Sequence, residues 1–301
     1  LKHVGMQEIA PLSQIVLALP ACSGILCNNC EEDIMTNLPH TKNLILDLSN
    51  DWLTIWLNRP DNRNALSDEM IEDFNNVFKS VRDDRSVRGI TFRGKEGVFC
   101  AGADLKAIKS IFDGKSKKED VIRFSVAAGN FFESINALPQ VTVMVIEGAA
   151  MAGGLGLACT GDFIITHKDT RFSLTETMIG LTPAQISPFV IQRLGFAKGK
   201  QLMLTAAHFN GEEAVKIGLA DFAGNTESEL EELEQKIKTQ VLKCAPGAIA
   251  ETKRLIGLIA NIPREEMVTI AGESFAERVL SDEGREGVAS FLKKRKPGWA
   301  L

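Results

Sequence analysis

Two loops rich in small residues most constrain how this chain can fold. The first, FCAGADL (Phe99–Leu105), follows the β-like run GITFRG, and the second, EGAAMAGGLGLACTGD (Glu147–Asp162), follows VTVMVIEG. Each loop opens a helix-like segment, so the sequence predicts two strand–loop–helix units. Backbone N–H groups at such turns are free to donate toward a ligand. Two donors that converge on one carbonyl oxygen would stabilise negative charge developing there.

Composition and charge narrow the class of protein. The chain has 301 residues, of which 45% are hydrophobic, and a net charge of −5, which argues against a broad nucleic-acid-binding surface. The apolar stretch around VTVMVIEG is interrupted by Pro139, Gln140 and Glu147, so no membrane span is predicted. Six cysteines in a chain of this size do not indicate a disulfide scaffold, and the expected location is a reducing cytoplasm.

The chain divides into three predicted parts. Residues 1–34 are expected to be a disordered leader, because they lack periodicity and their CNNC motif has no second Cys/His pair that would complete a metal site. Residues 35–235 alternate strands and helices, which predicts a layered α/β core. Residues 236–301 are mostly helical in pattern. Within the core, LILDL and LTIWL predict a hairpin, and Ser67 is a predicted helix N-cap.

A glycine-rich loop after a strand also suggests phosphate binding. The segment AGGLGLA contains Gly153, Gly154 and Gly156, but it lacks the spacing of a dinucleotide-binding or P-loop motif. The glycines could instead serve close helix packing alone. Close packing accounts for Gly154 and Gly156, but it does not account for the matching loop at FCAGADL.

Five motifs in order resemble the crotonase (enoyl-CoA hydratase/isomerase) superfamily. They are NRPDNRNALS, GVFCAGADL, the glycine-rich block, FSLTETMIGLTP and EGVASFLKKRKPGW, and the similarity covers about Leu44 to Trp299. The resemblance implies an α/β fold, a spiral of β-β-α units with a C-terminal helical trimerisation region. Trimers, which often pair into hexamers, are therefore the expected assembly.

The resemblance also implies a site. It makes the backbone N–H groups of Ala103 and Gly153 the donors to a thioester oxygen. Coenzyme A is expected as part of the substrate, with no separate cofactor and no metal. The residues that the resemblance assigns to substrate and coenzyme A binding are Arg63, Asn64, Ala65, Leu66, Ala101, Asp104, Leu105, Gly156 and Lys294.

The acid–base group is expected to be a single glutamate. Familiar hydratases of this superfamily use two glutamates; the later one maps onto Glu176, but the earlier one maps onto Gly156. Glu147 is close in sequence but sits before the turn. One carboxylate can move a proton between two carbons, or it can serve both halves of a syn hydration. An apolar pocket lined by Met178, Ile179 and Phe189 would raise its pKa and suit either role.

The glycine-rich block, taken with TETMIGLTPAQISPFVIQRLG, is similar to bacterial methylglutaconyl-CoA and isohexenylglutaconyl-CoA hydratases. This resemblance implies a lyase of acyl-CoA or fatty acid metabolism that hydrates a branched enoyl-CoA; the alternative is a one-glutamate Δ3-Δ2 enoyl-CoA isomerase. Candidates to contact a distal carboxylate are Gln185, Ser187 and Arg193. A non-enzymatic CoA-binding scaffold or an RNA-binding protein is a further alternative, and the acidic charge weighs against RNA.

Overall fold

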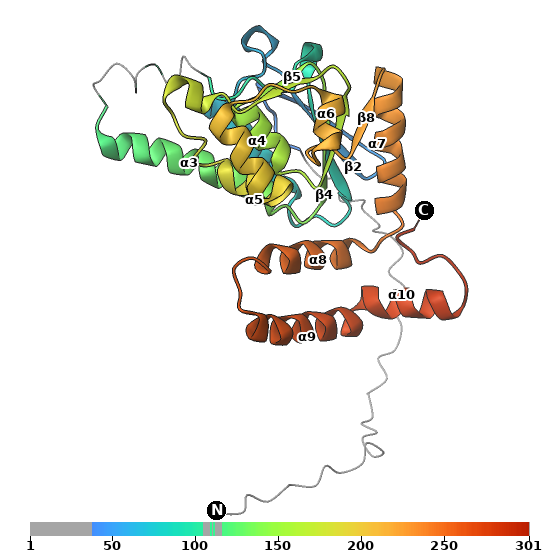
Figure 1. Ribbon diagram of the computed structural model, residues 1–301. Helices are drawn as coiled ribbons and strands as arrows, with labels where there is room; N and C mark the ends of the chain where they lie inside the picture. The colour runs from blue at the N-terminus through green and yellow to red at the C-terminus, as the bar shows by residue number, and fades with distance from the viewer. Residues whose placement is uncertain (1–37, 105–108, 110, 112–115, 301) are drawn as a thin grey trace, which may run out of the picture. The chain divides into compact units, whose positions relative to one another are not determined.

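The computed structural model describes residues 38–104, 109, 111 and 116–300, and they are coloured along the chain in Figure 1. The leader expected at 1–34 and the candidate residue Leu105 lie outside the described residues. Among the residues that are described, no helix has both the length and the apolar character needed to cross a membrane.

A sheet of six strands is ordered β1-β2-β3-β4-β6-β8, and the short strands β5 and β7 pair separately. β1 and β2 are antiparallel, as the predicted hairpin requires, and the other neighbouring pairs are parallel. The strands are β1 (Leu44–Ser49), β2 (Trp52–Leu57), β3 (Gly89–Gly94), β4 (Val141–Ile146), β5 (Ala149–Met151), β6 (Phe163–His167), β7 (Arg171–Ser173) and β8 (Phe222–Gly224).

The helices follow the apolar periodicity of the sequence. In α1, Ser67 is the N-cap and its hydroxyl accepts a hydrogen bond from the Met70 backbone N–H at 3.3 Å, as predicted. The helices are α1 (Asp68–Val81), α3 (Lys118–Asn136), α4 (Gly153–Cys159), α5 (Ser187–Thr205), α6 (Gly211–Lys216), α7 (Glu227–Val241), α8 (Pro246–Leu258), α9 (Arg264–Leu280) and α10 (Asp282–Leu292), with short 3₁₀ turns η1 (Pro60–Asn62), η2 (Lys95–Gly97) and η3 (Glu176–Ile179).

Two apolar cores lie on the sheet. The larger one packs strand residues such as Ile55 and Phe92 against α1, α3, α4 and α5. The smaller one packs Val143 and Ile165 against Leu230 and Ile237 of α7. α7 spans residues 235 and 236, between which the sequence placed the start of the C-terminal region. Because α7 buries its apolar side chains on the sheet, the spiral core extends through this helix and the C-terminal region begins with α8.

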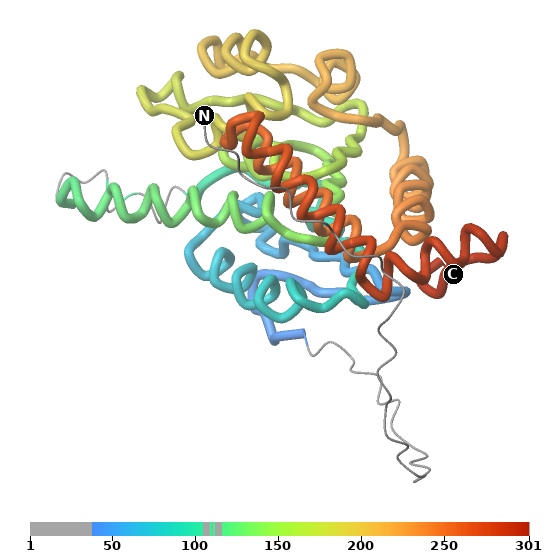
Figure 2. The backbone as a smooth tube through the Cα atoms, turned by 90° about the horizontal axis from the view of Figure 1, so that it is seen from below, coloured from blue at the N-terminus to red at the C-terminus, as the bar shows by residue number. Residues whose placement is uncertain are grey.

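Helices α8, α9 and α10 lie together below the strands in Figure 1, and the view from below shows them in front of the strands (Figure 2). Lys253 of α8 donates to the Gln140 carbonyl at 2.8 Å and forms an ion pair with Asp162. Gln140 and Asp162 directly precede β4 and β6. The C-terminal helices are therefore attached at the end of the sheet where the parallel strands begin.

A buried arginine fastens both ends of this helical region. Arg88, which directly precedes β3, donates to the carbonyl of Trp299 at 3.1 Å and to the carbonyl of Cys244. Cys244 comes just before α8 and Trp299 just after α10. The start and the end of the region therefore meet at one guanidinium group.

Candidate active site

The two glycine-containing loops leave the opposite end of the sheet, after the carboxyl ends of β3 and β4. In open α/β sheets this is the end where ligands bind. The loops are joined backbone to backbone, since Cys100 N–H donates to Ala149 O at 3.1 Å and Met151 N–H donates to Cys100 O at 3.0 Å. This parallel bridge brings FCAGADL beside the start of α4.

The N–H of Ala103 points away from Leu66, to which the neighbouring residues Gly102 and Asp104 are hydrogen-bonded. Leu66 N–H donates to Gly102 O at 2.8 Å, and Asp104 N–H donates to Leu66 O at 2.9 Å. Gly102 has φ +97°, a conformation that L side chains rarely adopt. Because bonding alternates along such a bridge, the Ala103 N–H faces the other way, and it has no hydrogen-bond partner among the described residues.

Gly153 is the first residue of α4, so its N–H has no partner within the helix. The preceding residue, Ala152, has φ +49° and ψ −121°, and its own N–H donates to Ser173 O at 2.8 Å. A Cβ atom placed on Gly153 would lie 3.7 Å from the backbone nitrogen of Ala103. The structure thus brings the two predicted donors together, each directly after a residue of positive φ.

Gly154 is needed for this approach. A Cβ atom there would lie 2.2 Å from the carbonyl oxygen of Cys100 and 2.8 Å from its carbonyl carbon. Backbone atoms cannot rotate away as a side chain can. Any larger residue at 154 would therefore push the two loops apart and separate the donors.

Glu176 opens the turn η3 near the same loops. Its position follows from β7, which pairs with β5 so that Ser173 is opposite Met151; Glu176 and Gly153 come shortly after these paired residues. The carboxyl is half-buried, and its Oε2 atom has no hydrogen-bond partner among the described residues. Burial raises the pKa of Glu176, and a hydrogen bond from its own backbone N–H opposes that shift.

The surroundings of Glu176 differ from the apolar pocket that the sequence predicted. Phe189 is buried, but Met178 and Ile179 are 66% and 65% exposed. They follow Glu176 on the turn and point outward, so they do not supply its burial in a single chain.

Gly156 faces the side chain of Ile186 within the core. A Cβ atom on Gly156 would lie 2.1 Å from Ile186 Cγ2 and 2.6 Å from Ile186 Cβ. The volume that a side chain at 156 would need is therefore already filled. The alternative acid, Glu147, pairs with Arg93 at 3.1 Å, and its carbonyl accepts the Phe99 N–H, so this acid is committed to the fold.

The structure pairs the two segments expected to bind coenzyme A. Ala101 N–H donates to Arg63 O at 3.1 Å, beside the bonds through Leu66 described above. The side chain of Asn64 is buried and bonds to Lys95 O at 3.0 Å, to Val98 O at 2.6 Å and to the Arg59 N–H at 2.8 Å. Asn64 therefore holds the loop from inside, and Arg63 beside it is exposed.

Arg59 is a residue that the sequence reading missed. It donates to Asp104 Oδ2 at 2.8 Å and to Ala65 O at 2.6 Å, and so ties the same two segments together. Its place two residues after the end of β2, in the motif NRPDNRNALS, is the signal that could have found it. The bond also means that Asp104 is engaged with the protein itself.

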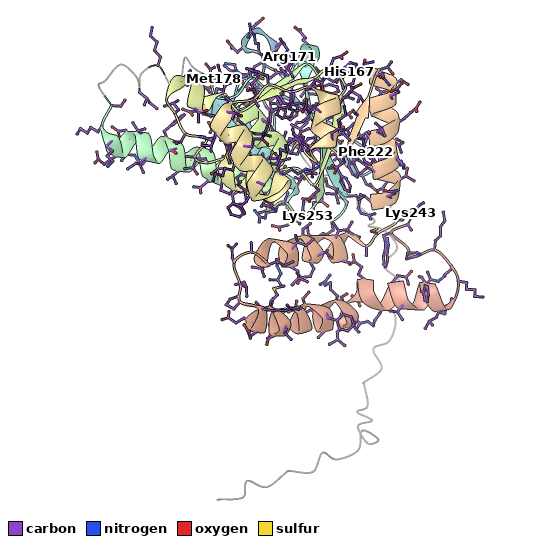
Figure 3. The ribbon with its side chains drawn as sticks, viewed as in Figure 1. His167, Arg171, Met178, Phe222, Lys243 and Lys253 are labelled. Atoms are coloured by element: carbon purple, nitrogen blue, oxygen red, sulfur yellow. The ribbon has the colours of Figure 1, made fainter. Side chains whose placement is uncertain are left out.

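Lys294 lies elsewhere in the same chain. Its segment ends at Trp299, which is bonded to Arg88 at the amino end of β3, whereas Ala103 follows the carboxyl end. In Figure 3, Met178 of η3 is labelled well away from Lys253, which lies on the side of the C-terminal helices. One copy of the chain does not bring Lys294 to the paired loops.

The candidates for a distal carboxylate also have partners. Arg193 bonds to Asp221 Oδ2 at 2.5 Å, to Leu219 O at 2.9 Å and to Asp162 O at 3.2 Å, so its guanidinium is committed to the fold. Ser187 Oγ donates to Ala184 O at 2.9 Å. Gln185 Nε2 donates to Ser125 Oγ of α3 at 2.9 Å, which leaves its amide oxygen as a polar group between α3 and α5.

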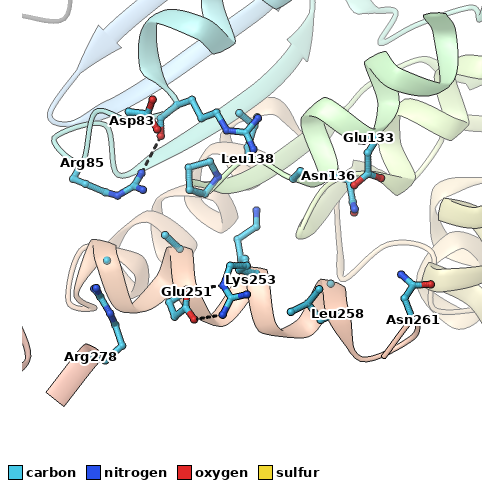
Figure 4. A pocket seen from close by; sticks show the side chains of 17 residues that line it. Asp83, Arg85, Glu133, Asn136, Leu138, Glu251, Lys253, Leu258, Asn261 and Arg278 are labelled. Carbon is cyan, nitrogen blue, oxygen red and sulfur yellow. Dashed lines mark hydrogen bonds and ion pairs between the residues drawn. The ribbon is translucent and has the colours of Figure 1, made fainter. Parts of the chain in front are cut away.

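A cavity of about 640 Å³ lies between α8 and the ends of α1 and α3 (Figure 4). Its walls carry charged groups that already have partners, such as Arg254 with Glu251 and Lys253 with Asp162. Ala103, Gly153 and Glu176 do not line it. The cavity therefore belongs to the docking of α8, and the candidate chemistry is at the other end of the sheet.

Comparison with known proteins decides the family. A family profile described as Enoyl-CoA hydratase/isomerase matches residues 48–300. The chain belongs to the enoyl-CoA hydratase/isomerase family. It is 31% identical to human enoyl-CoA hydratase domain-containing protein 2, mitochondrial, over 81% of this chain and 83% of that protein.

Two solved structures are similar to this chain over most of its length. Pseudomonas aeruginosa AtuE superposes with a TM-score of 0.83 at 40% identity, covering 86% of this chain and 100% of that one. An enoyl-CoA hydratase/isomerase from Marinobacter aquaeolei gives 0.82 at 34% identity, covering 86% and 99%. The α/β fold class expected from the sequence is confirmed, and the chain is an enzyme of this family acting in acyl-CoA metabolism.

Proposed function

We propose that this enzyme adds water to the double bond of an α,β-unsaturated acyl-CoA whose acyl group is branched and of the glutaconyl type. The observation that supports the proposal is the combination of two convergent backbone donors, at Ala103 and Gly153, with one desolvated carboxylate, Glu176. The reaction needs no metal and no cofactor besides the coenzyme A of the substrate.

The proposed mechanism assigns one task to each group. The N–H groups of Ala103 and Gly153 donate to the thioester oxygen and hold the negative charge that develops there as the enolate forms. Glu176 takes a proton from the water whose oxygen bonds to the β-carbon. The protonated Glu176 then returns a proton to the α-carbon as the enolate collapses to the thioester, and the carboxylate is regenerated.

The raised pKa of Glu176 suits both halves of this cycle. A carboxylate that is costly to ionise is a stronger base toward the attacking water, and the carboxyl that results can return a proton to the α-carbon of the enolate. With Ile186 filling the volume beside Gly156, a second carboxylate at that position does not share the work. Gln185 Nε2 carries two N–H donors; one is bonded to Ser125 Oγ at 2.9 Å, and the other is proposed to donate to the distal carboxylate of the acyl group.

A trimer, or a pair of trimers, is the proposed assembly. Large apolar side chains are exposed on the C-terminal helices, including Phe275 at 72% and Phe291 at 82%, and contiguous exposed apolar surface marks interaction sites. A second copy could also supply Lys294 to the coenzyme A phosphates, which one copy does not. Light scattering after size exclusion tests the assembly, and Phe291→Asp is expected to shift it toward monomer. The cytoplasmic location stays a prediction.

The reaction is tested by following the absorbance of the conjugated enoyl thioester. The substrates are crotonyl-CoA, 3-methylglutaconyl-CoA, isohexenylglutaconyl-CoA and 3-hexenoyl-CoA. Loss of absorbance with the first three reports hydration, with the largest kcat/KM expected for a branched glutaconyl substrate. A gain of absorbance from 3-hexenoyl-CoA alone would identify the isomerase instead.

A further inference from the structure

Two consecutive side chains ahead of α5 fit against glycines of two different helices. Ile186 covers Gly156 of α4, where an added Cβ would lie 2.1 Å from Ile186 Cγ2. Gln185 covers Gly129 of α3, where an added Cβ would lie 2.3 Å from Gln185 Oε1. The segment 185–186 therefore acts as a wedge between α3 and α4, which lie beside α5 in Figure 1.

The wedge has little freedom to withdraw. Ile186 is 4% exposed, and its carbonyl accepts the Val190 N–H at 3.0 Å in the first turn of α5. Gln185 is bonded to Ser125 of α3 at 2.9 Å. A side chain at 156 would meet Ile186 Cβ at 2.6 Å as well as the flexible end of the side chain, so a rotamer change of Ile186 alone does not make room.

The wedge is also the downstream anchor of the catalytic turn. Leu181 N–H donates to Glu176 O at 3.0 Å, and a few residues then lead to Ile186. A displacement of Ile186 is therefore transmitted along a short piece of backbone to Glu176. Residue 186 therefore couples the size of the side chain at position 156 to the position of Glu176.

We infer that Ile186 is a positioning residue that keeps this site a single-carboxylate site: it fills the place of a side chain at 156 and holds the turn of Glu176. The inference deepens the proposed function and rests on Glu176 acting alone. An acid introduced at 156 cannot serve the reaction while Ile186 is present, but it can once residue 186 has no side chain.

The test is a double-mutant cycle with wild type, Gly156→Glu, Ile186→Gly and the double variant. Thermal unfolding without substrate is measured first, followed by kcat, KM and the pH profile on the best substrate. Gly156→Glu is expected to lower the Tm and to lower kcat more than tenfold. The double variant is expected to recover about tenfold in kcat over Gly156→Glu, as residues in contact are coupled by this amount, and to show a second ionisation in its pH profile.

Additive changes in Tm, or a Gly156→Glu protein as stable and active as wild type, would overturn the inference. If Ile186→Gly does not fold, the Gly156→Ala and Ile186→Ala cycle decides. Removing Cγ2 relieves the 2.1 Å contact and leaves the 2.6 Å contact with Cβ, so a smaller coupling of Tm with the same sign is expected. Gly154→Ala is the matched control, since it clashes with the Cys100 backbone and must not be rescued at 186. The Tm cycle needs no turnover, so its failure is separable from failure of the hydratase proposal.

Discussion

The two halves of the candidate site are held in different ways. The donor loops are fixed by main-chain hydrogen bonds through Cys100, and Gly154 admits a carbonyl where a Cβ would sit. The Glu176 turn is fixed by side chains, with Ile186 and Gln185 inserted between helices. Backbone contacts require particular glycines, whereas side-chain contacts depend on fitted volumes. A substitution in the donor loops should therefore cause a large loss of activity, whereas a substitution around the Glu176 turn should cause a graded loss.

The largest effect is expected at the carboxylate itself. Glu176→Gln removes the acid–base group while keeping its shape, so kcat is expected to fall about 1,000-fold with little change in KM. Steady-state kinetics on the best 2-enoyl-CoA measures this. The matched control is Glu147→Gln, an acid paired with Arg93, for which kcat should stay within a few-fold of wild type. Full activity of Glu176→Gln would remove Glu176 from the mechanism.

The next effect tests the backbone half. Gly154→Ala forces Cβ against the Cys100 carbonyl and separates the donors, so kcat/KM is expected to fall about 100-fold, the cost of one lost donor. The Tm should fall too. Gly257→Ala on α8 is the control, because a Cβ there meets nothing within 4 Å and alanine stabilises a helix interior by about 0.5–1 kcal/mol relative to glycine. Wild-type kinetics for Gly154→Ala would contradict the donor geometry.

A pH series addresses the desolvation of Glu176. Because burial raises the pKa of Glu176 above the ordinary value of a glutamate side chain, kcat/KM should rise with pH until it levels off above the raised pKa. Stability should respond in the opposite sense, since the folded protein keeps this proton after the unfolded chain has lost it, and stability falls as pH rises through that window. The comparison is Tm against pH for wild type and Glu176→Gln; equal slopes would show that Glu176 is not desolvated.

The smallest effect is expected in the side-chain half. Gln185→Ala removes the bond to Ser125, worth about 1 kcal/mol, so Tm should fall by about 2–4 °C and kcat/KM by less than about tenfold. Gln192→Ala, at an exposed position of α5, is the control with no expected change. If Gln185→Ala lowered kcat/KM as much as Gly154→Ala does, the donor loops and the Glu176 turn would not differ in their tolerance of substitution.

The difference between backbone and side-chain contacts also explains which features could be predicted from the sequence. Glycine pairs after strands, a hairpin turn and the Ser67 cap are local signals, and each was confirmed by the structure. The motifs also located Ala103 and Gly153 correctly beside each other. These features depend on backbone geometry, which the positions of glycine, proline and capping residues in the sequence indicate directly.

Side-chain directions were not available from the sequence. Asn64 was expected to meet coenzyme A but points into the fold, and Met178 was expected to bury Glu176 but is exposed. A motif fixes the position of a residue and not where its side chain goes. The Ile186 contact with Gly156 joins two helices with no shared periodicity, so no pattern signals it. The boundary predicted after residue 235 falls inside α7, because the helical pattern of the sequence shows no break there.

The Arg88 clasp makes the helical region from Cys244 to Trp299 a non-covalent ring, closed at a single cation. A ring can be opened at one point and still keep its other attachments. Glu283 of α10 also accepts hydrogen bonds from the backbone N–H groups of Gly247 and Ala248 in α8, each at 2.9 Å. Loss of the last residues would therefore leave α10 attached to α8, and α8 attached through Lys253 and Asp162. Loss of Arg88 would remove the hydrogen bonds at both ends of the ring at once, so the three helices would then depend on Lys253 for their attachment ahead of β4 and β6.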